Sequence, residues 1–190
     1  MSPMFLGFAA LLVFFGGLRL LELVVSQRNW RRHQEERRER LREPLFVWMV
    51  LLHGSLFVVL PLEFFLGQPA FGGPLSMAAG VVLVVALVLR LWTLTTMGRS
   101  WNVRVVYGED YPIVSNGPFR FIRHPNYLVV ILELLALPLL FHLYLSAVWL
   151  TCLNAAVLFF RIRNEEAVLF QNPSWVAEMA NKPRFFPRFR

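Results

Sequence analysis

The sequence predicts an all-α fold, that of a polytopic integral membrane protein. Of its 190 residues, 57% are hydrophobic, and the mean hydropathy is +0.54. A soluble domain is nearer to about 45–50% apolar. The apolar residues gather into long runs, and arginines gather in some of the segments between the runs. Together these observations favour about five transmembrane helices.

The apolar runs define the expected elements. Runs at 4–25, 45–66 and 75–97 are each long enough for a span, which takes about 20 apolar residues. Two shorter runs, at 127–141 and 146–160, are expected to form a helical hairpin. This hairpin either spans with help from its flanks or lies buried among the other helices. No run alternates as a barrel strand does, so helices must satisfy the backbone in lipid.

Basic residues predict the orientation. Arginines are frequent after the first, third and fifth runs, whereas 67–74 carries no charge. Positive loops stay cytoplasmic, so we expect the N-terminus outside and residues 26–44, 98–125 and 161–190 inside. The first run has no basic leading region and no small-residue cleavage site, so we expect a retained helix rather than a signal peptide.

Charge and cysteine content exclude several classes. The net charge of +7 suggests nucleic acid. However, the basic residues flank the spans, where they set topology and meet anionic lipid head groups, so we expect no nucleic-acid partner. Cys152 is the only cysteine, and no cysteine- or histidine-based metal pattern occurs, so we expect no disulfide and no metal. The absence of GxGxxG and GxxxxGK[ST] motifs argues against a soluble nucleotide-binding domain.

The segment 98–125 differs from the rest of the chain. It is polar and aromatic, and Pro112 and the pair Gly117-Pro118 interrupt any continuous helix. Loops of this length are uncommon unless they are functional. We expect the segment and the C-terminal tail to form a cytoplasmic cap over the helix ends, with Pro125 in the first turn of the fourth helix.

Two motif clusters flank the predicted hairpin. Residues 117–119 (Gly-Pro-Phe) and 123–127 (Arg-His-Pro-Asn-Tyr) precede it, and residues 161–166 (Arg-Ile-Arg-Asn-Glu-Glu) follow it. Ionisable groups beside membrane spans are costly and usually functional. In order and spacing, the clusters resemble the isoprenylcysteine carboxyl methyltransferase family, and the likeness covers residues 98–170.

The N-terminal half is similar to one bacterial branch of that family. The similarity rests on Arg19-x-x-Glu22 and on Ser26-Gln-Arg-Asn29. Members of this branch O-methylate alkylpyrones and phenolic lipids. The resemblance therefore implies an S-adenosylmethionine-dependent O-methyltransferase in the bacterial inner (cytoplasmic) membrane, with its active site facing the cytoplasm. It also implies a three-helix membrane region at 1–97 and a methyltransferase core at 98–190.

The resemblance further assigns the site. It implies two catalytic residues, Arg161 on the acceptor side and His124. The sequence departs from the family pattern at Phe119, where tyrosine is more usual, and at Arg104, where eukaryotic members have glutamine. The implied cofactor-binding residues are Arg104, Tyr111, Pro112, Ile113, Val114, Phe119, His124, Pro125, Asn126, Tyr127 and Glu165.

These residue types suit methyl transfer. The Glu165 carboxylate accepts hydrogen bonds from a cofactor, and the planar Arg161 guanidinium holds an acceptor carboxylate or phenolate. His124 donates to a cofactor carboxylate or removes a phenolic proton. As structural alternatives, His124 simply ends a helix, and Glu165 and Glu166 form surface pairs with Arg161 and its neighbour Arg163 at helical spacing.

Other polar residues in the runs have structural explanations. Arg19 and Glu22 lie one turn apart and are expected to pair. Arg90 and Glu133 are expected to pair between the third and fourth helices, or alternatively to face a substrate cavity. His53 is expected to be a packing or hydrogen-bonding residue.

The sequence leaves more than one methyl acceptor and more than one class of protein function open. The acceptor is a phenolic or pyrone lipid, a prenylcysteine-like carboxylate, or another lipophilic alcohol or acid that enters from the bilayer. Membrane lipid is the other expected partner, and the sequence predicts no oligomeric state. A membrane reductase using NADPH and a non-catalytic membrane scaffold are the competing classes. Binding of S-adenosylhomocysteine, of NADPH or of neither separates the three.

Overall fold

The computed structural model describes residues 2–35, 39–40, 46–104, 106–107 and 112–187. This part of the chain is nearly all helical. Its two strands are two residues long and pair antiparallel, with Glu39 opposite Tyr107. In chain order the elements are α1 (Pro3–Glu35), β1 (Glu39–Arg40), α2 (Phe46–Leu66), α3 (Gly73–Met97), the 3-10 helix η1 (Gly98–Ser100), β2 (Val106–Tyr107), the 3-10 helix η2 (Gly117–Arg120), α4 (Pro125–Leu139), α5 (Tyr144–Leu169) and α6 (Pro173–Met179).

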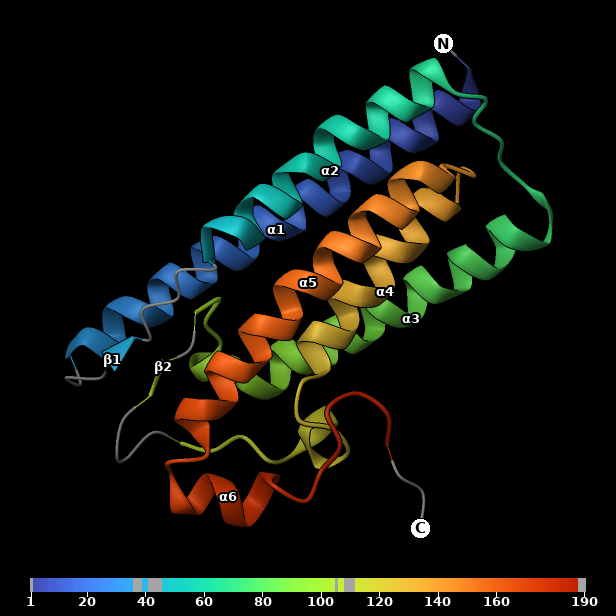
Figure 1. Ribbon diagram of the computed structural model, residues 1–190. Helices are drawn as coiled ribbons and strands as arrows, with labels where there is room; N and C mark the ends of the chain where they lie inside the picture. Colours follow the sequence, from blue (N-terminus) through green and yellow to red (C-terminus); the bar gives the residue numbers. More distant parts are fainter. Residues whose placement is uncertain (1, 36–38, 41–45, 105, 108–111, 188–190) are drawn as a thin grey trace.

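The five long helices form a bundle around one apolar core. Helix α4 packs between α3 and α5, and α5 also packs on α2. Helix α1 lies along α2, where the rings of Phe8 and Phe64 stack with centroids 4.1 Å apart. All five helices contribute buried residues to the core. Figure 1 shows α6 and the C-terminal segment at one end of the bundle, and the N-terminus and the α2–α3 connection at the other.

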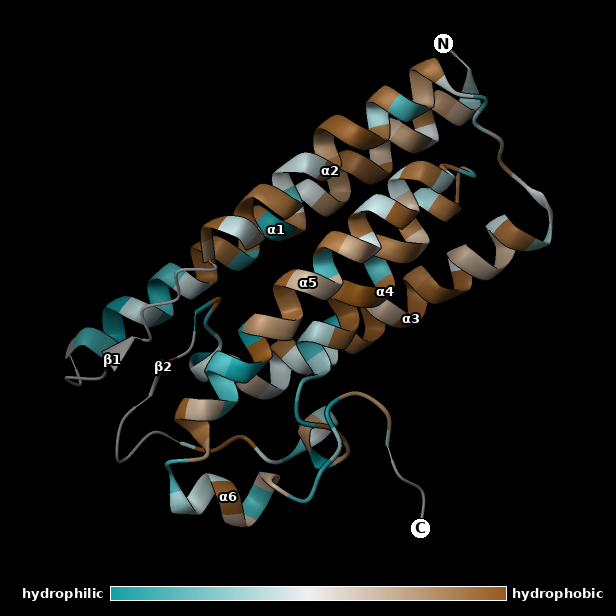
Figure 2. Ribbon diagram, in the orientation of Figure 1, coloured by the Kyte–Doolittle hydropathy of each residue, from teal (hydrophilic) through white to brown (hydrophobic). Residues whose placement is uncertain are grey.

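The protein is a polytopic integral membrane protein. Within the described residues, α1, α2, α3 and α5 are long and apolar enough to cross a membrane, and α4 is a shorter apolar helix. Figure 2 shows hydrophobic residues along the length of these helices and hydrophilic ones gathered toward the end that carries α6. The all-α prediction is confirmed, and so is the prediction that the 98–125 segment and the C-terminal segment meet at one end of the bundle.

Two predicted helix ends are wrong. The first helix does not stop near residue 25 but continues to Glu35, and the fifth runs on from residue 160 to Leu169. Both extensions are polar, and both bury polar side chains against the rest of the protein, such as Asn29 and Glu166. Hydropathy therefore marks where the apolar stretch ends, whereas tertiary contacts decide where the helix ends.

A carboxylate from α2 caps the start of α5. The backbone N–H groups of Leu145 and Ser146 donate to the two oxygens of Glu63, over 3.0 and 2.6 Å. The first N–H groups of a helix have no intrahelical partner, and the positive end of the helix dipole favours an anion there. Glu63 therefore ties the end of α2 to the beginning of α5.

The inward face of α1 changes from apolar to polar along its length. Its buried residues recur at intervals of seven residues and then of three or four, spacings that keep one helix face against its partners. The half of this face nearer the N-terminus is apolar, and the half nearer the α6 end is polar. We call this face the α1 seam; its buried members are Phe8, Phe15, Glu22, Ser26, Asn29 and His33.

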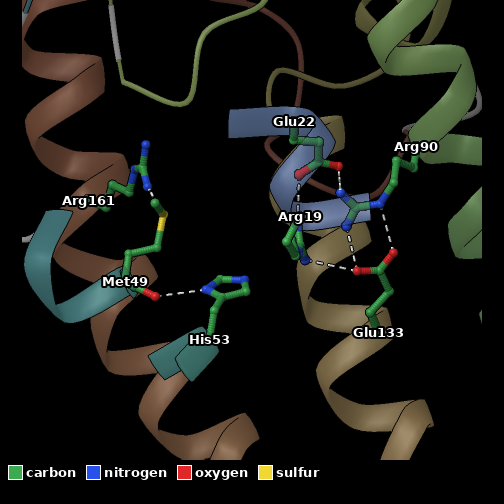
Figure 3. A network of polar contacts seen from close by, with 7 residues as sticks. All are labelled: Arg19, Glu22, Met49, His53, Arg90, Glu133 and Arg161. Carbon is green, nitrogen blue, oxygen red and sulfur yellow. Dashed lines mark hydrogen bonds and ion pairs between the residues drawn. The ribbon is translucent and has the colours of Figure 1, made fainter. Parts of the chain in front are cut away.

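Four charged residues join α1, α3 and α4 inside the bundle (Figure 3). The Arg90 guanidinium, 1% exposed, donates to Glu133 Oε1 over 2.8 Å and to Glu133 Oε2 over 2.5 Å, and it also bonds Glu22. Arg19 donates to Glu22 over 3.0 Å and to Glu133 over 2.9 Å. Each carboxylate thus bridges both guanidiniums, and the group carries no net charge.

This ion-pair tetrad (Arg19, Glu22, Arg90 and Glu133) confirms both predicted pairs and joins them into one network. None of its members lines the large cavity described below, as far as the described residues define it. The contacts therefore favour the structural explanation of Arg90 and Glu133 over a place in a substrate cavity.

We predict that Arg90→Leu lowers the free energy of unfolding by about 3–5 kcal/mol, because it leaves two buried carboxylates with one guanidinium. The double variant Arg90→Leu/Glu133→Leu should be less destabilised, since Arg19 and Glu22 still form a neutral pair. Thermal unfolding in detergent measures both variants. A double variant that is less stable than Arg90→Leu would contradict this account.

The orientation stays a prediction, and labelling tests it. In a Cys152→Ala background, Ala70→Cys lies between α2 and α3, and Glu35→Cys lies at the end of α1. A membrane-impermeant maleimide on intact cells should modify residue 70 at once and residue 35 only after permeabilisation. Modification of both from the same side would end the five-helix topology.

Candidate functional site

A cavity of about 790 Å³ opens at the α6 end of the bundle. The 98–125 segment, the start of α4, the end of α5 and α6 surround it. The lining residues are Met97, Ser100, Trp101, Asn102, Val103, Arg104, Val106, Pro112, Ile113, Val114, Phe119, Arg123, His124, Pro125, Asn126, Tyr127, Arg161, Glu165, Val168, Leu169, Gln171, Asn172, Pro173, Ser174, Trp175 and Met179.

The cavity gathers the residues that the family resemblance assigns. Tyr111 lies outside the described residues; all the other assigned positions line the cavity, although they come from three separate stretches of the chain. Their individual roles stay predictions. The positions brought together are Arg104, Pro112, Ile113, Val114, Phe119, His124, Pro125, Asn126, Tyr127, Arg161 and Glu165.

The start of α4 holds His124 and Tyr127 in place. Pro125 begins the helix, as its fixed backbone angle and missing N–H favour. The rings of His124 and Tyr127 stack with centroids 5.2 Å apart. The Tyr127 hydroxyl donates to the carboxylate of Glu165, so the first turn of α4 is attached to α5 across the cavity wall.

The adjacent carboxylates on α5 have different surroundings. Glu165 lines the cavity, whereas Glu166 is buried and lies 3.0 Å from His124 Nε2. Glu166 also accepts from Arg184 over 2.6 Å and lies 3.4 Å from an Arg123 nitrogen. These contacts run to α4 and to the C-terminal segment, so the alternative of pairing along the α5 surface is wrong for Glu166.

Residues 182–184 of the C-terminal segment cross the start of α4. We call these three residues the strap. The N–H of Arg123 donates to the carbonyl of Pro183 over 2.9 Å, and the N–H of His124 donates to that of Arg184 over 3.1 Å. Lys182 Nζ donates to the Phe119 carbonyl over 2.9 Å. Burial lowers the pKa of Lys182, and the hydrogen bond to Glu166 raises that of Arg184.

Arg161 is buried at the membrane side of the cavity. Its guanidinium contacts Met49 Sδ and donates to the carbonyl of Val103, and it lies 5.5 Å from the centroid of the Tyr127 ring. Figure 3 shows Met49 between Arg161 and His53. His53 Nδ1 donates to the Met49 carbonyl over 2.8 Å, which confirms His53 as a hydrogen-bonding residue.

The α1 seam holds the turn that forms one wall of the cavity. Asn29 Nδ2 donates to the carbonyls of Gly98 and Trp101 over 3.1 and 2.8 Å. The N–H of Val103 donates to Ser26 Oγ over 3.0 Å. Sequence reasoning missed both seam residues, as well as Glu166 and Arg184. The seven-residue recurrence of Phe8, Phe15, Glu22 and Asn29 is the signal that identifies the seam.

Several polar atoms of the lining have no hydrogen-bond partner. These atoms are buried and meet no partner in the part of the chain that the structure describes. They are Oδ1 and Nδ2 of Asn102, Nε1 of Trp101 and Oδ1 of Asn126. Unpaired buried polar groups are rare in folded proteins because each forfeits its bonds to water. Donors and acceptors of this kind in a cavity wall suit a polar ligand.

Comparison with known proteins agrees with this geometry. The profile of the "Isoprenylcysteine carboxyl methyltransferase (ICMT) family" matches residues 78–171, which include both motif clusters. A relative from Bacillus subtilis (strain 168), "Uncharacterized protein YpbQ", is 30% identical over 151 residues, or 80% of this chain and 89% of the relative. The chain therefore belongs to the isoprenylcysteine carboxyl methyltransferase family, a family of membrane methyltransferases.

Proposed function

We propose that this protein transfers a methyl group from S-adenosylmethionine to an oxygen of a lipophilic acceptor. The observation that carries the proposal is that separate motif clusters bring Glu165, Arg161 and His124 into one cavity at the α6 end. We further propose that this end faces the cytoplasm from a bacterial inner membrane, in keeping with the arginine-rich segments on that side.

The cavity fits such a cofactor in size and in chemistry. Sites for small molecules usually span about 300–1,000 Å³, and this cavity has about 790 Å³. Arg104, Arg161 and His124 offer partners for a carboxylate, and Glu165 offers one for an ammonium or for ribose hydroxyls. The unpaired atoms of Asn102 and Asn126 offer further neutral hydrogen bonds.

When bound, S-adenosylmethionine supplies an electrophilic methyl group on a positively charged sulfur. The acceptor oxygen would bond to the methyl carbon while the carbon–sulfur bond breaks and its electron pair returns to sulfur. The protein's part is to align the reacting atoms and exclude water. Arg161 lies one helical turn before Glu165 on α5, so groups held by these two residues lie close together.

We propose that His124 accepts the proton of a hydroxyl acceptor. Its Nε2 faces the carboxylate of Glu166, so the neutral imidazole that donates from Nε2 keeps its lone pair on Nδ1. A carboxylate that fixes the tautomer in this way is a common support for a histidine base. A hydroxyl acceptor would pass its proton to Nδ1, whereas a carboxylate acceptor needs no base.

The acceptor's apolar part belongs in the bilayer. Met49, which contacts Arg161, lies on α2, whose outer face exposes large apolar residues such as Val50 and Phe57. The polar head would meet Arg161, and the tail would lie among lipid chains. A phenolic or pyrone lipid and a prenylcysteine-like carboxylate both fit this description.

One incubation tests the proposal. Detergent-purified protein is mixed with S-adenosylmethionine carrying a labelled methyl group and with a total lipid extract, and the labelled product is identified. We expect a methyl ether or ester of a lipid. Binding of NADPH without S-adenosylhomocysteine would favour a reductase instead, and binding of neither would favour a scaffold.

Glu165→Ala should weaken the binding of S-adenosylhomocysteine by roughly 10- to 150-fold, and so should His124→Ala. The reason is that a hydrogen bond to a charged group contributes about 1.5–3 kcal/mol. Calorimetry on folded variants measures the change. Glu178→Ala is the matched control, because Glu178 is exposed on α6 and outside the cavity lining. Unchanged affinity in both site variants would remove these residues from the cofactor site.

Arg161→Lys should fold and bind S-adenosylhomocysteine almost normally but transfer methyl groups about 10²-fold more slowly, because a small misplacement of reactants has an effect of this order. Lysine keeps the charge but lacks the planar fork that holds both the acceptor and the Val103 carbonyl. The defect should appear in kcat rather than in KM. Wild-type turnover in this variant would show that Arg161 does not position the acceptor.

A further inference from the structure

The turn at residues 98–103 is held unusually firmly for a loop. The side chain of Asn29 on α1 fixes the first part of this turn, because its Nδ2 donates to the carbonyls of Gly98 and Trp101. Val103 is fixed at both backbone groups, since its N–H donates to Ser26 and its carbonyl accepts from Arg161. Two helices, α1 and α5, therefore set the position of this turn.

Asn102 lies between these fixed points and is one of the residues that line the cavity. Its carboxamide oxygen and nitrogen are both buried, and neither has a partner among the described residues. A buried carboxamide that forms no hydrogen bond is unfavourable for both its donor and its acceptor. A ligand with one acceptor and one donor side by side would satisfy both.

Charge decides which part of the cofactor suits this carboxamide. Among the described lining residues, Arg104, Arg123 and Arg161 are cations, and Glu165 is the carboxylate. The charged amino-acid end of S-adenosylmethionine is best held by such charged groups. The neutral carboxamide of Asn102 is left for the neutral end, the adenine base. An asparagine can bond the N6 amino group and the N7 atom of adenine together.

We propose that Asn102 is a binding residue that recognises the adenine edge of the cofactor, held in position by Ser26 and Asn29 of the α1 seam. The proposal rests on the proposed function, because it needs S-adenosylmethionine in this cavity. It also gives α1, which lies wholly outside the family-matched residues 78–171, a part in forming the site.

The test compares two ligands by calorimetry on the full-length protein in detergent. One is S-adenosylhomocysteine, and the other is the same molecule without the 6-amino group of adenine. The wild type should prefer S-adenosylhomocysteine by roughly 5- to 100-fold, because the carboxamide oxygen is left unpaired with the second ligand. In Asn102→Leu the affinities for the two ligands should differ by no more than about twofold.

The ratio of the two affinities separates adenine recognition from a merely structural role of Asn102. A structural role would weaken the binding of both ligands equally and leave their ratio unchanged. Asn164→Leu is the matched control, because Asn164 is exposed on α5 and outside the cavity lining; it should keep the wild-type preference. If Asn102→Leu does not fold, Asn102→Ala replaces it.

Two results would overturn the proposal while the proposed function stands. They are a wild type that binds both ligands equally, and an Asn102 variant that keeps the full preference. A wild type that binds neither ligand would instead count against the proposed function itself.

Discussion

The rest of the structure depends on the ion-pair tetrad inside the bundle. A membrane supplies no water to solvate a buried charge, so Arg90 is tolerated there only because Glu22 and Glu133 surround it. The tetrad fixes α1 against α3 and α4 at one depth and in one rotation. That rotation turns Ser26 and Asn29, one and two turns further along α1, toward the wall of the cavity. A structural contact within the membrane thus sets the geometry of a site at its surface.

The cavity is assembled from parts that hold one another in position through shared contacts. Helix α5 supplies Arg161, Glu165 and Glu166, and each of these side chains is tied to a different partner: the 98–103 turn, the first turn of α4 and the strap. The strap in turn occupies the backbone N–H groups at the start of α4. Since these contacts share elements, a change at one of them is expected to reach the others. This interdependence suits a site whose chemistry is mainly alignment.

Much of this fold can be read from the sequence, and the exceptions have one physical cause. Helices α2 and α3 lie within two residues of their apolar runs, because prolines and glycines bound those runs. The ends of α1 and α5 were mispredicted because polar residues there are buried by tertiary contacts that hydropathy does not register. The motif clusters contain Arg161, Glu165 and His124, and all three residues line one cavity in the folded protein. Glu166 and Arg184 were missed because only the folded chain places the strap beside α5.

The strap gives the site a place in the order of synthesis. Residues 182–184 follow α5 in the chain, so the strap leaves the ribosome only after α5 has done so. Until then the start of α4 lacks its partners at Pro183 and Arg184, and Glu166 lacks its arginine. The cavity therefore cannot be complete until the segment after α5 has joined the bundle.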